Sequence, residues 1–419
     1  MAVRARRAGS DTESGEVRGG GLPRLAMAAR ARGGCAACGV RGMEVRWARD
    51  PRPPARRGRR PAVAASASAA AAPEPVGGPA CWRGSDLSYD GRGWVLELSN
   101  ADVAELDRAL EETAGRDLAS LSASDFLLDG LGPKLKEIKR GLVHGRGIAL
   151  LRGLPVERLS LEEAARAFWG MGLHLGGVDP VPQNAQGHLL GHVKDIGGDP
   201  GRDRIYTTSA AQPYHTDSAD IVGLLCLKQA AQGGESMVVS STLIWDKLCS
   251  MVPRLAVALR DNLVVWDRKG EVPEGKDPFF AVPTFRSVES GRMCSILDRS
   301  FVVAAQEKYS EADGVPRLSQ ELVEALDAAE ACAEAYRLEM LLAPGDIQLL
   351  HNHQCWHARA PYTDSAQPRH LLRLWLSTRD GWALPPEYTE RYGPVTLGSV
   401  RGGIRCPGVT PYAPLDPTG

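Results

Sequence analysis

Residues 345–359, with the sequence GDIQLLHNHQCWHAR, decide the fold, because a tight turn at Gly345 leads into a strand that runs into several histidines. Short apolar segments of the same kind occur on both sides, each bounded by glycine, proline or polar turns. They span residues 147–152, 222–228, 236–240, 262–266, 338–342, 346–351 and 370–377. We therefore expect a mainly β protein with flanking helices and a double-stranded β-helix, or jelly-roll, core.

Three segments have helical spacing, at residues 100–113, 160–169 and 319–336. We expect Asn100 to cap the first, and Ser160 with Glu163 to form a capping box at the start of the second. Only these three helices interrupt the strands, and they do not alternate with the strands regularly. The pattern therefore does not fit a doubly wound parallel sheet. They are expected to lie outside a β core.

The composition divides the 419 residues into three regions. Residues 1–79 are rich in Arg, Ala, Gly, Pro and Ser, so we expect a disordered leader. Residues 80–395 alternate helical and strand patterns and form the folded domain, and residues 396–419 are expected to be a C-terminal tail. No run approaches the roughly 18 consecutive apolar residues that a membrane-spanning helix needs.

Charge is distributed unevenly along the chain. Residues 1–60 contain 15 Arg, no Lys and five acidic residues, whereas the remainder holds 35 basic and 46 acidic residues. An acidic body argues against nucleic acid or an anionic membrane as the main partner, because both bind basic patches. A small-molecule substrate is expected instead. The Arg-rich leader resembles a transit peptide and favours the chloroplast, with the mitochondrion or, if the chain starts at Met27 or Met43, the cytosol as alternatives.

One candidate metal motif lies at residues 213–217, PYHTD, where His215 and Asp217 stand two positions apart. In extended backbone such residues project from the same face, so an imidazole and a carboxylate can share one metal ion. A third ligand could come from His351, His353 or His357. Period-two alternation does not choose among these three, because odd positions share a face for as long as the strand persists.

Two arginines, Arg369 and Arg373, lie four residues apart in the strongly strand-like segment 369–377, RHLLRLWLS. They share a face and are separated by roughly 13 Å along the strand. We expect them to serve opposite ends of one pocket. A guanidinium group donates two parallel hydrogen bonds to a carboxylate, which is what a dicarboxylate cosubstrate requires.

From about residue 82 to 382 the sequence resembles the taurine dioxygenase (TauD/TfdA-like) family, within the clavaminate synthase-like group of 2-oxoglutarate oxygenases. The elements that carry the resemblance fall in the family's order: His215-x-Asp217, Gly233-Gly234-Glu235-Ser236, His357, Arg369 and Arg373. It implies that His215, Asp217 and His357 form the facial triad that binds Fe(II) and leaves open positions. The spacing from Asn352 favours His357 over His353.

The resemblance also implies binding roles for three further residues. Arg369 is expected to bind the distal carboxylate of 2-oxoglutarate, helped by the Ser236 hydroxyl. Arg373 would lie nearer the iron, positioned for the other carboxylate or for an anionic substrate. With O2, such a site hydroxylates a small organic metabolite and releases succinate and CO2, and retention of Asp217 argues against halogenation.

Residues that choose the substrate are expected in the irregular stretch before the metal motif. The candidates are Gln183, Asn184, Tyr206, Thr208 and Gln212, while His188 and His192 are assigned structural roles. Two alternatives to the oxygenase stay open: a catalytically degenerate jelly roll that binds or regulates, and a Zn-dependent enzyme on the same ligands. The first would be expected to have lost a ligand or an arginine, and the second has no need of both arginines.

Overall fold

The computed structural model describes residues 72–87, 93–200 and 204–416. The chain divides into two compact units, Met1–Ser66 and Ala67–Gly419, and the first lies outside the described residues. Most of the leader predicted at residues 1–79 therefore has no structural account. The rest of the description concerns the second unit.

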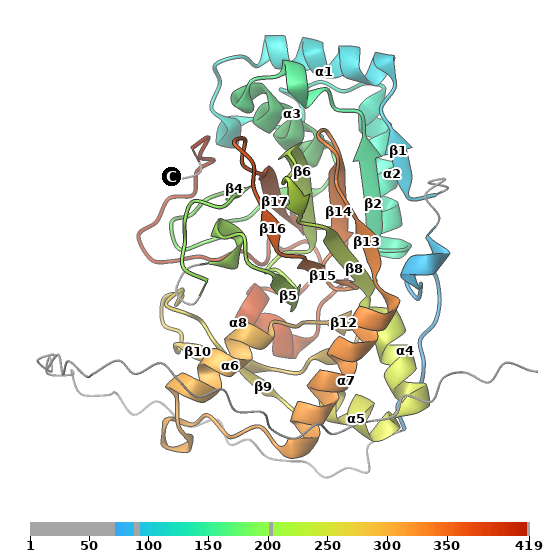
Figure 1. The fold of residues 1–419 in the computed structure, drawn as a ribbon, viewed down its shortest axis with the longest axis vertical. Helices are drawn as coiled ribbons and strands as arrows, with labels where there is room; N and C mark the ends of the chain where they lie inside the picture. The colour runs from blue at the N-terminus through green and yellow to red at the C-terminus, as the bar shows by residue number, and fades with distance from the viewer. Residues whose placement is uncertain (1–71, 88–92, 201–203, 417–419) are drawn as a thin grey trace, which may run out of the picture. The chain divides into compact units, whose positions relative to one another are not determined.

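The larger sheet has seven strands in the order β1-β2-β14-β6-β17-β3, with β4 also paired to β17 (Figure 1). All its pairings are antiparallel except that of β1 with β2. Its strands are β1 (Val95–Glu97), β2 (Ile148–Arg152), β3 (Val178–Pro180), β4 (Leu190–Val193), β6 (Ile221–Lys228), β14 (Ile347–His351) and β17 (His370–Thr378). Every residue of β17 is buried, which explains its nearly continuous apolar sequence.

The smaller sheet is antiparallel, in the order β13-β8-β15-β5. Its strands are β5 (Gln212–His215), β8 (Ser236–Ser240), β13 (Leu338–Met340) and β15 (Cys355–Arg359). Three strand pairs flank the two sheets: β7 (Gln232–Gly233) with β16 (Tyr362–Thr363), β9 (Val264–Asp267) with β10 (Phe279–Val282), and β11 (Phe285–Ser287) with β12 (Met293–Ser295). An apolar cluster that includes Leu150, Leu350 and Leu371 of the larger sheet and Val238 and Leu338 of the smaller sheet fills part of the interior. The predicted jelly-roll core is confirmed.

The segment 345–359 links the two sheets. Gly345 has a φ of 86°, and a side chain there would collide with the carbonyl oxygen of Leu154, so the turn requires glycine. The chain then runs along β14 in the larger sheet, turns at residues 352–354 and returns along β15 in the smaller sheet. This crossing places the histidines of the segment in different surroundings.

Helices cover both sides of the core. Near one end of the larger sheet lie α1 (Asn100–Glu112), α2 (Leu131–His144) and α3 (Leu161–His174), which pack on it through one apolar cluster (Figure 1). Toward the other end lie α4 (Ser241–Met251), α5 (Pro253–Asp261), α6 (Arg299–Lys308), α7 (Gln320–Tyr336) and the short α8 (Thr389–Tyr392). Six 3-10 turns complete the described elements: Gly84–Asp86, Leu118–Ser120, Val156–Arg158, η4 (Ile205–Thr207), Glu311–Asp313 and Pro386–Tyr388.

The expectation of only three helices was wrong, because α2, α4, α5 and α6 also form. Breakers in the sequence hide two of them: α2 contains Pro133 and two glycines, and α5 begins with Pro253. Helix α4 follows β8 without a gap, since Ser240 both ends the strand and caps the helix. The predicted Asn100 cap was also wrong, because Ser99 caps α1 and Asn100 is its first residue; the Ser160–Glu163 capping box is confirmed.

Both flanks of the predicted 80–395 domain pack against it in the described residues. The Trp245 indole donates to the carbonyl of Glu74 (2.9 Å), and the amide of Val76 donates to Asp246 (2.6 Å). Beyond residue 395, Tyr412 pairs with the 187–189 segment through two backbone hydrogen bonds, of 2.7 and 3.1 Å. The domain boundaries stay predictions, but the segment named a tail contributes a wall of the site described below.

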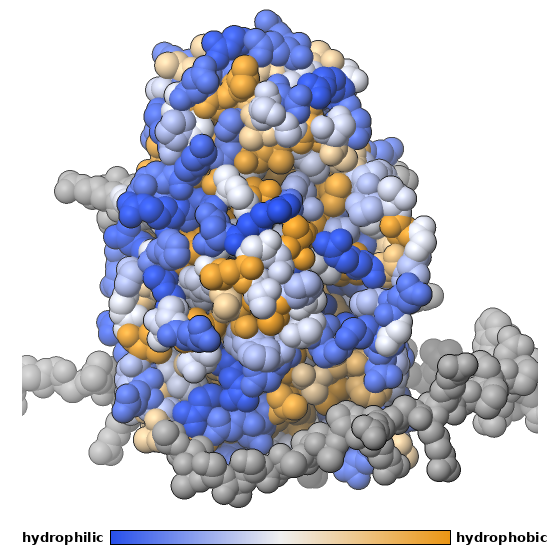
Figure 2. Space-filling model, turned by 180° about the vertical axis from the view of Figure 1, so that it is seen from behind, coloured by the Kyte–Doolittle hydropathy of each residue, from blue (hydrophilic) through white to orange (hydrophobic). Residues whose placement is uncertain are grey.

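No helix among the described residues is long and apolar enough to cross a membrane. On the face drawn in Figure 2, hydrophobic residues lie in small areas separated by hydrophilic ones.

Candidate active site

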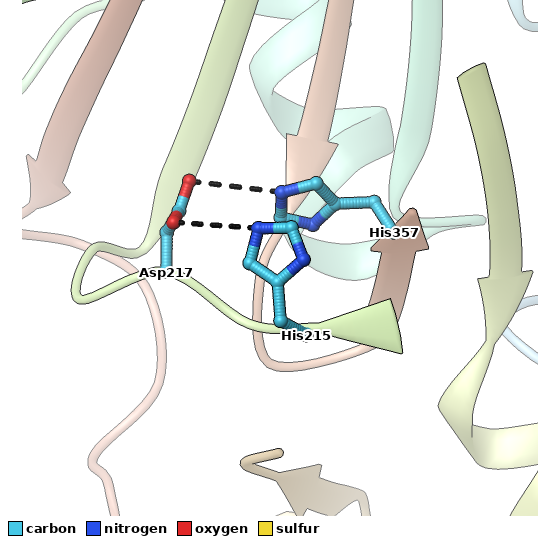
Figure 3. Close-up of side chains that lie close together, drawn as sticks. All are labelled: His215, Asp217 and His357. Carbon is cyan, nitrogen blue, oxygen red and sulfur yellow. Dashed lines mark ion pairs between the residues drawn. The ribbon is translucent and has the colours of Figure 1, made fainter. Parts of the chain in front are cut away.

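Two histidines and one carboxylate meet at the edge of the smaller sheet (Figure 3). His357 on β15 is the cross-strand partner of His215 on β5, so their side chains share a face and their ring centroids lie 4.1 Å apart. Asp217 follows two residues after β5, with Oδ1 3.8 Å from His215 Nε2 and Oδ2 3.6 Å from His357 Nε2. All three are buried, with ligand atoms within 4.8 Å of one another, and they form the one such cluster found in the described part of the chain.

Neighbouring groups fix the orientation of these side chains. The Pro213 carbonyl accepts a hydrogen bond from His215 Nδ1 (2.9 Å), so the lone pair of this imidazole lies on Nε2, facing Asp217. The Gln212 amide donates to this Nε2 (2.9 Å) and would turn aside on metal binding. Trp375 Nε1 donates to Asp217 Oδ2 (2.9 Å), and the Asn352 side chain bonds both the amide and the carbonyl of Asp217.

The pKa shifts favour the ligand forms of these groups. Burial and the neighbouring His357 lower the pKa of His215 to about 4, against the opposing influence of Asp217. Burial alone would raise the pKa of Asp217, but Arg373 and the two histidines hold it well below its usual range. A neutral imidazole and an ionised carboxylate are the forms that bind metal. Two imidazole nitrogens and one carboxylate on one side of an ion fit mononuclear Fe(II), with positions left open.

His351 and His353 lie outside the cluster. Strand β14 ends at His351, so period-two alternation does not continue to His357. His353 is fully buried and its Nε2 lies 2.8 Å from Asp220 Oδ1, while Asp220 also accepts from Arg401 Nε (2.9 Å) and the Thr378 amide (2.7 Å). Of the three histidines that the spacing left open, the structure brings only His357 to His215 and Asp217.

A pocket opens beside the cluster, lined in part by His215 and His357. All three predicted cosubstrate residues line it as well: Ser236, Arg369 and Arg373. Arg373 Nη1 lies 3.6 Å from Asp217 Oδ2, whereas the Arg369 guanidinium lies over the Tyr362 ring, 5.0 Å from its centroid. Of the two arginines, only Arg373 lies next to the metal cluster, which is the arrangement that the family resemblance implied.

Ser236 is tied to a neighbouring amide. Its hydroxyl donates to Gln348 Oε1 (2.6 Å), while Gln348 Nε2 is buried without a hydrogen-bond partner. Because the two ends of a carboxamide have the same shape, turning the Gln348 side chain would let its nitrogen donate to Ser236. The Ser236 hydroxyl would then be free to donate to a carboxylate in the pocket.

A second pocket shares Arg373 and Tyr206 with the first. Its other lining residues are Gln183, Asn184, Gln186, His188, Gly191, His192, Thr207 and Tyr412. Three of the five predicted substrate residues therefore lie here, Gln212 lies in the first pocket, and Thr208 lines neither of them. His188, assigned a structural role, contacts Tyr412 through its Nε2 and the phenol oxygen (2.9 Å).

Arg359 and Tyr412 are among the pocket residues that the sequence analysis missed. Arg359 stands two positions after His357, and the same alternation that pairs His215 with Asp217 would have placed it on the metal face. Tyr412 belongs to the segment predicted to be a tail, and no local pattern points from residue 412 to residue 188. Only the folded chain brings them together.

A jelly roll with two histidines, one carboxylate and buried arginines around a single pocket defines the class of non-haem iron oxygenases. The family model described as "Taurine catabolism dioxygenase TauD, TfdA family" matches residues 107–375. The chain belongs to this family and is an Fe(II)- and 2-oxoglutarate-dependent dioxygenase that uses O2.

Relatives support this assignment over most of the chain. FR-33289 synthase of Streptomyces rubellomurinus is 32% identical over 336 residues, which cover 76% of this chain and 96% of the relative. A taurine hydroxylase-like protein of Stachybotrys chartarum is 30% identical over 319 residues, covering 73% and 80%. The fold is similar to that of asparagine oxygenase solved with Fe(II), 3-hydroxyasparagine and succinate, with a TM-score of 0.51, 16% identity and coverage of 67% and 93%.

Proposed function

We propose that the chain hydroxylates a small organic anion with release of succinate and CO2, and that His215, Asp217 and His357 hold the Fe(II). The observation that carries the proposal is the single pocket that joins the two histidines of this cluster to Arg369 and Arg373. Iron supplies the O2 activation and the oxidising power. The zinc and binding-protein alternatives give no reason for the two buried arginines.

The protein's own residues would bind and orient 2-oxoglutarate and the substrate. Arg369 binds the distal carboxylate of 2-oxoglutarate, with the Ser236 hydroxyl as a second donor once Gln348 has turned. The cosubstrate then spans the pocket from these residues to the metal cluster. Arg373 lies between the two pockets, fixed by Gln183, which accepts from its Nε (2.7 Å), and by the Tyr206 and Trp375 rings at 4.8 and 4.9 Å. It is positioned to bind an anionic group of the substrate.

The second pocket supports an anionic substrate. Among the residues described as lining it there is no Asp or Glu, so an ammonium or guanidinium group would find no carboxylate partner there. Its polar side chains are amides, hydroxyls and two histidines, with Arg373 as the one charged group. Burial lowers the pKa of both His188 and His192, which keeps these imidazoles neutral.

Anaerobic titration tests the cosubstrate. Protein lacking residues 1–71 and loaded with Fe(II) is expected to develop the weak visible charge-transfer band of the chelate when 2-oxoglutarate is added. Under O2, a set of sulfonates, phosphonates, phosphate esters and carboxylates is then screened for succinate release above the rate without substrate, with amines of equal size as controls. A folded, iron-loaded protein without the band contradicts the proposal, and stimulation by amines alone contradicts its substrate class.

The leader supports a plastid location. Its 15 Arg and five acidic residues within positions 1–60 have the composition of an organellar transit peptide. A fluorescent protein fused after residue 79 is expected to enter chloroplasts when expressed in plant cells, and a fusion to residues 80–419 alone is expected to stay outside. Mitochondrial or cytosolic fluorescence of the first fusion would contradict this location.

A further inference from the structure

Arg359 lies beside the cosubstrate pocket, and it has no part in the binding roles described above. It ends β15, two residues after His357, so both side chains lie on the same face of the strand. Across the smaller sheet its direct partner is Ser236. Arg359 lines the metal-side pocket together with Ser236 and Arg369. Ser236 of β8, Arg359 of β15 and Arg369, the residue before β17, therefore supply three donors to the same pocket.

The two guanidinium groups are buried without an anion. Arg359 is 6% exposed and Arg369 is 5% exposed, and both lie over the Tyr362 ring, at 4.9 and 5.0 Å from its centroid. Among the described residues, no carboxylate lies within 4.0 Å of either group. Nε and Nη1 of Arg359 and Nη1 of Arg369 are buried without hydrogen-bond partners. Burying two neighbouring cations is costly unless an anion with acceptor oxygens joins them.

We propose that Arg359 and Arg369 form a two-arginine clamp for the distal carboxylate of 2-oxoglutarate. The inference rests on the proposed function, since that function supplies the anion. A carboxylate offers two oxygens and about four lone-pair sites, enough for both guanidinium groups and the Ser236 hydroxyl. The carboxylate of the cosubstrate neutralises the charge of one of the two arginines. The partly exposed Asp364 and Asp195 lie near enough to interact electrostatically with the two guanidinium groups.

The clamp also connects the cosubstrate to the second pocket. Arg359 Nη2 donates to the carbonyl of Thr208 (3.0 Å) and to that of Ala210. These carbonyls directly follow η4, which supplies Tyr206 and Thr207 to the second pocket. An Arg359 fixed by the carboxylate therefore holds residues 206–210 in place. Cosubstrate binding is expected to order this wall before the substrate enters.

Binding of two 2-oxo acids tests the clamp. In anaerobic Fe(II)-loaded protein, Arg359→Gln is expected to weaken 2-oxoglutarate binding by roughly 10- to 100-fold, as for the loss of hydrogen bonds to a charged group. Pyruvate, which lacks the distal carboxylate, should bind the variant and the wild type alike. Arg369→Gln should give the same pattern. Arg359→Lys keeps the positive charge but loses the forked guanidinium group, so it should weaken 2-oxoglutarate binding to an intermediate extent. The charge-transfer band gives both affinities.

Hydrogen exchange provides the second measurement. Addition of 2-oxoglutarate to the wild type is expected to protect the amides of residues 205–211, and neither pyruvate nor the Arg359→Gln variant with saturating 2-oxoglutarate should give this protection. Arg379→Gln is the matched control, because Arg379 directly follows β17 as Arg369 directly precedes it, but Arg379 is exposed and pairs with Asp179. It should leave both measurements unchanged.

The outcomes separate the clamp from the proposed function. Unchanged 2-oxoglutarate affinity in Arg359→Gln, in a wild type that shows the band, overturns the clamp and leaves the function intact. Equal loss of 2-oxoglutarate and pyruvate binding also overturns it, because Arg359 would then only support the pocket. A wild type that forms the band with neither acid overturns the proposed function itself.

Discussion

A His357→Ala variant is expected to lose iron binding, whereas His353→Ala is expected to keep it. His357 supplies one of only three protein ligands in the cluster, with its Nε2 3.6 Å from Asp217. Changes to groups that merely support a ligand already weaken metal affinity by about 10- to 100-fold, so loss of the ligand itself should cost more than that. His353 instead lies within the 352–354 turn, in the network of Asp220 and Arg401.

Iron content of the two purified variants, reconstituted anaerobically with Fe(II), measures this difference. Circular dichroism in the near ultraviolet checks that both variants are folded. This control is needed because His353→Ala also removes a buried hydrogen-bond partner and lowers stability. Iron retained in His357→Ala and lost in folded His353→Ala would place the metal site at the turn and contradict the geometry.

The Asp220→Asn variant is expected to lose about 3–5 kcal/mol of stability, the usual effect of removing one partner from a buried ion pair. Asp220 is fully buried and accepts hydrogen bonds from Arg401 Nε (2.9 Å), His353 Nε2 (2.8 Å) and the Thr378 amide (2.7 Å). Arg401, 1% exposed, would keep its charge with no counter-ion in contact. The midpoint of urea unfolding of the full chain should fall accordingly.

A matched variant, Asp179→Asn, removes the carboxylate of the exposed Arg379–Asp179 pair and should lower the stability far less, because water and salt screen an exposed ion pair. Equal losses in the two variants would show that the buried network contributes no more than a surface pair.

The pH dependence of the stability that Asp220 contributes has a definite sign. Burial alone would raise the pKa of Asp220, but His353 and Arg401 lower it from 3.8 to about 2. Its stabilisation is thus complete above pH 3.8 and is lost as the pH falls towards 2.

The strands could be predicted from the sequence better than the helices. A segment such as residues 370–377 is mostly apolar because both faces of β17 are buried, and this signal is local. Helix α4 has no such signal, since it continues directly from β8, and the breakers in α2 and α5 are tolerated because their apolar faces pack on the core. Packing overrides propensity there.

Within the site, spacing was enough for His215 and Asp217, because two residues of one strand and its extension need no knowledge of the fold. The choice of His357 needed the family pattern, since alternation alone fails once the chain turns at residue 352. The pairing of Asp220 with Arg401 joins positions 181 residues apart, and no local pattern contains it. Contacts of this kind come from the topology.

Tyr412 is synthesised after all the other residues that form the two pockets. The metal cluster and both arginines of the clamp are complete by residue 369, but the wall of the second pocket waits for a residue made 43 positions later. During synthesis, the part of the enzyme that activates oxygen can therefore emerge from the ribosome before the part that holds the substrate. A chain that ended before Tyr412 would therefore keep the three metal ligands and both arginines of the clamp, but would lack this wall of the second pocket.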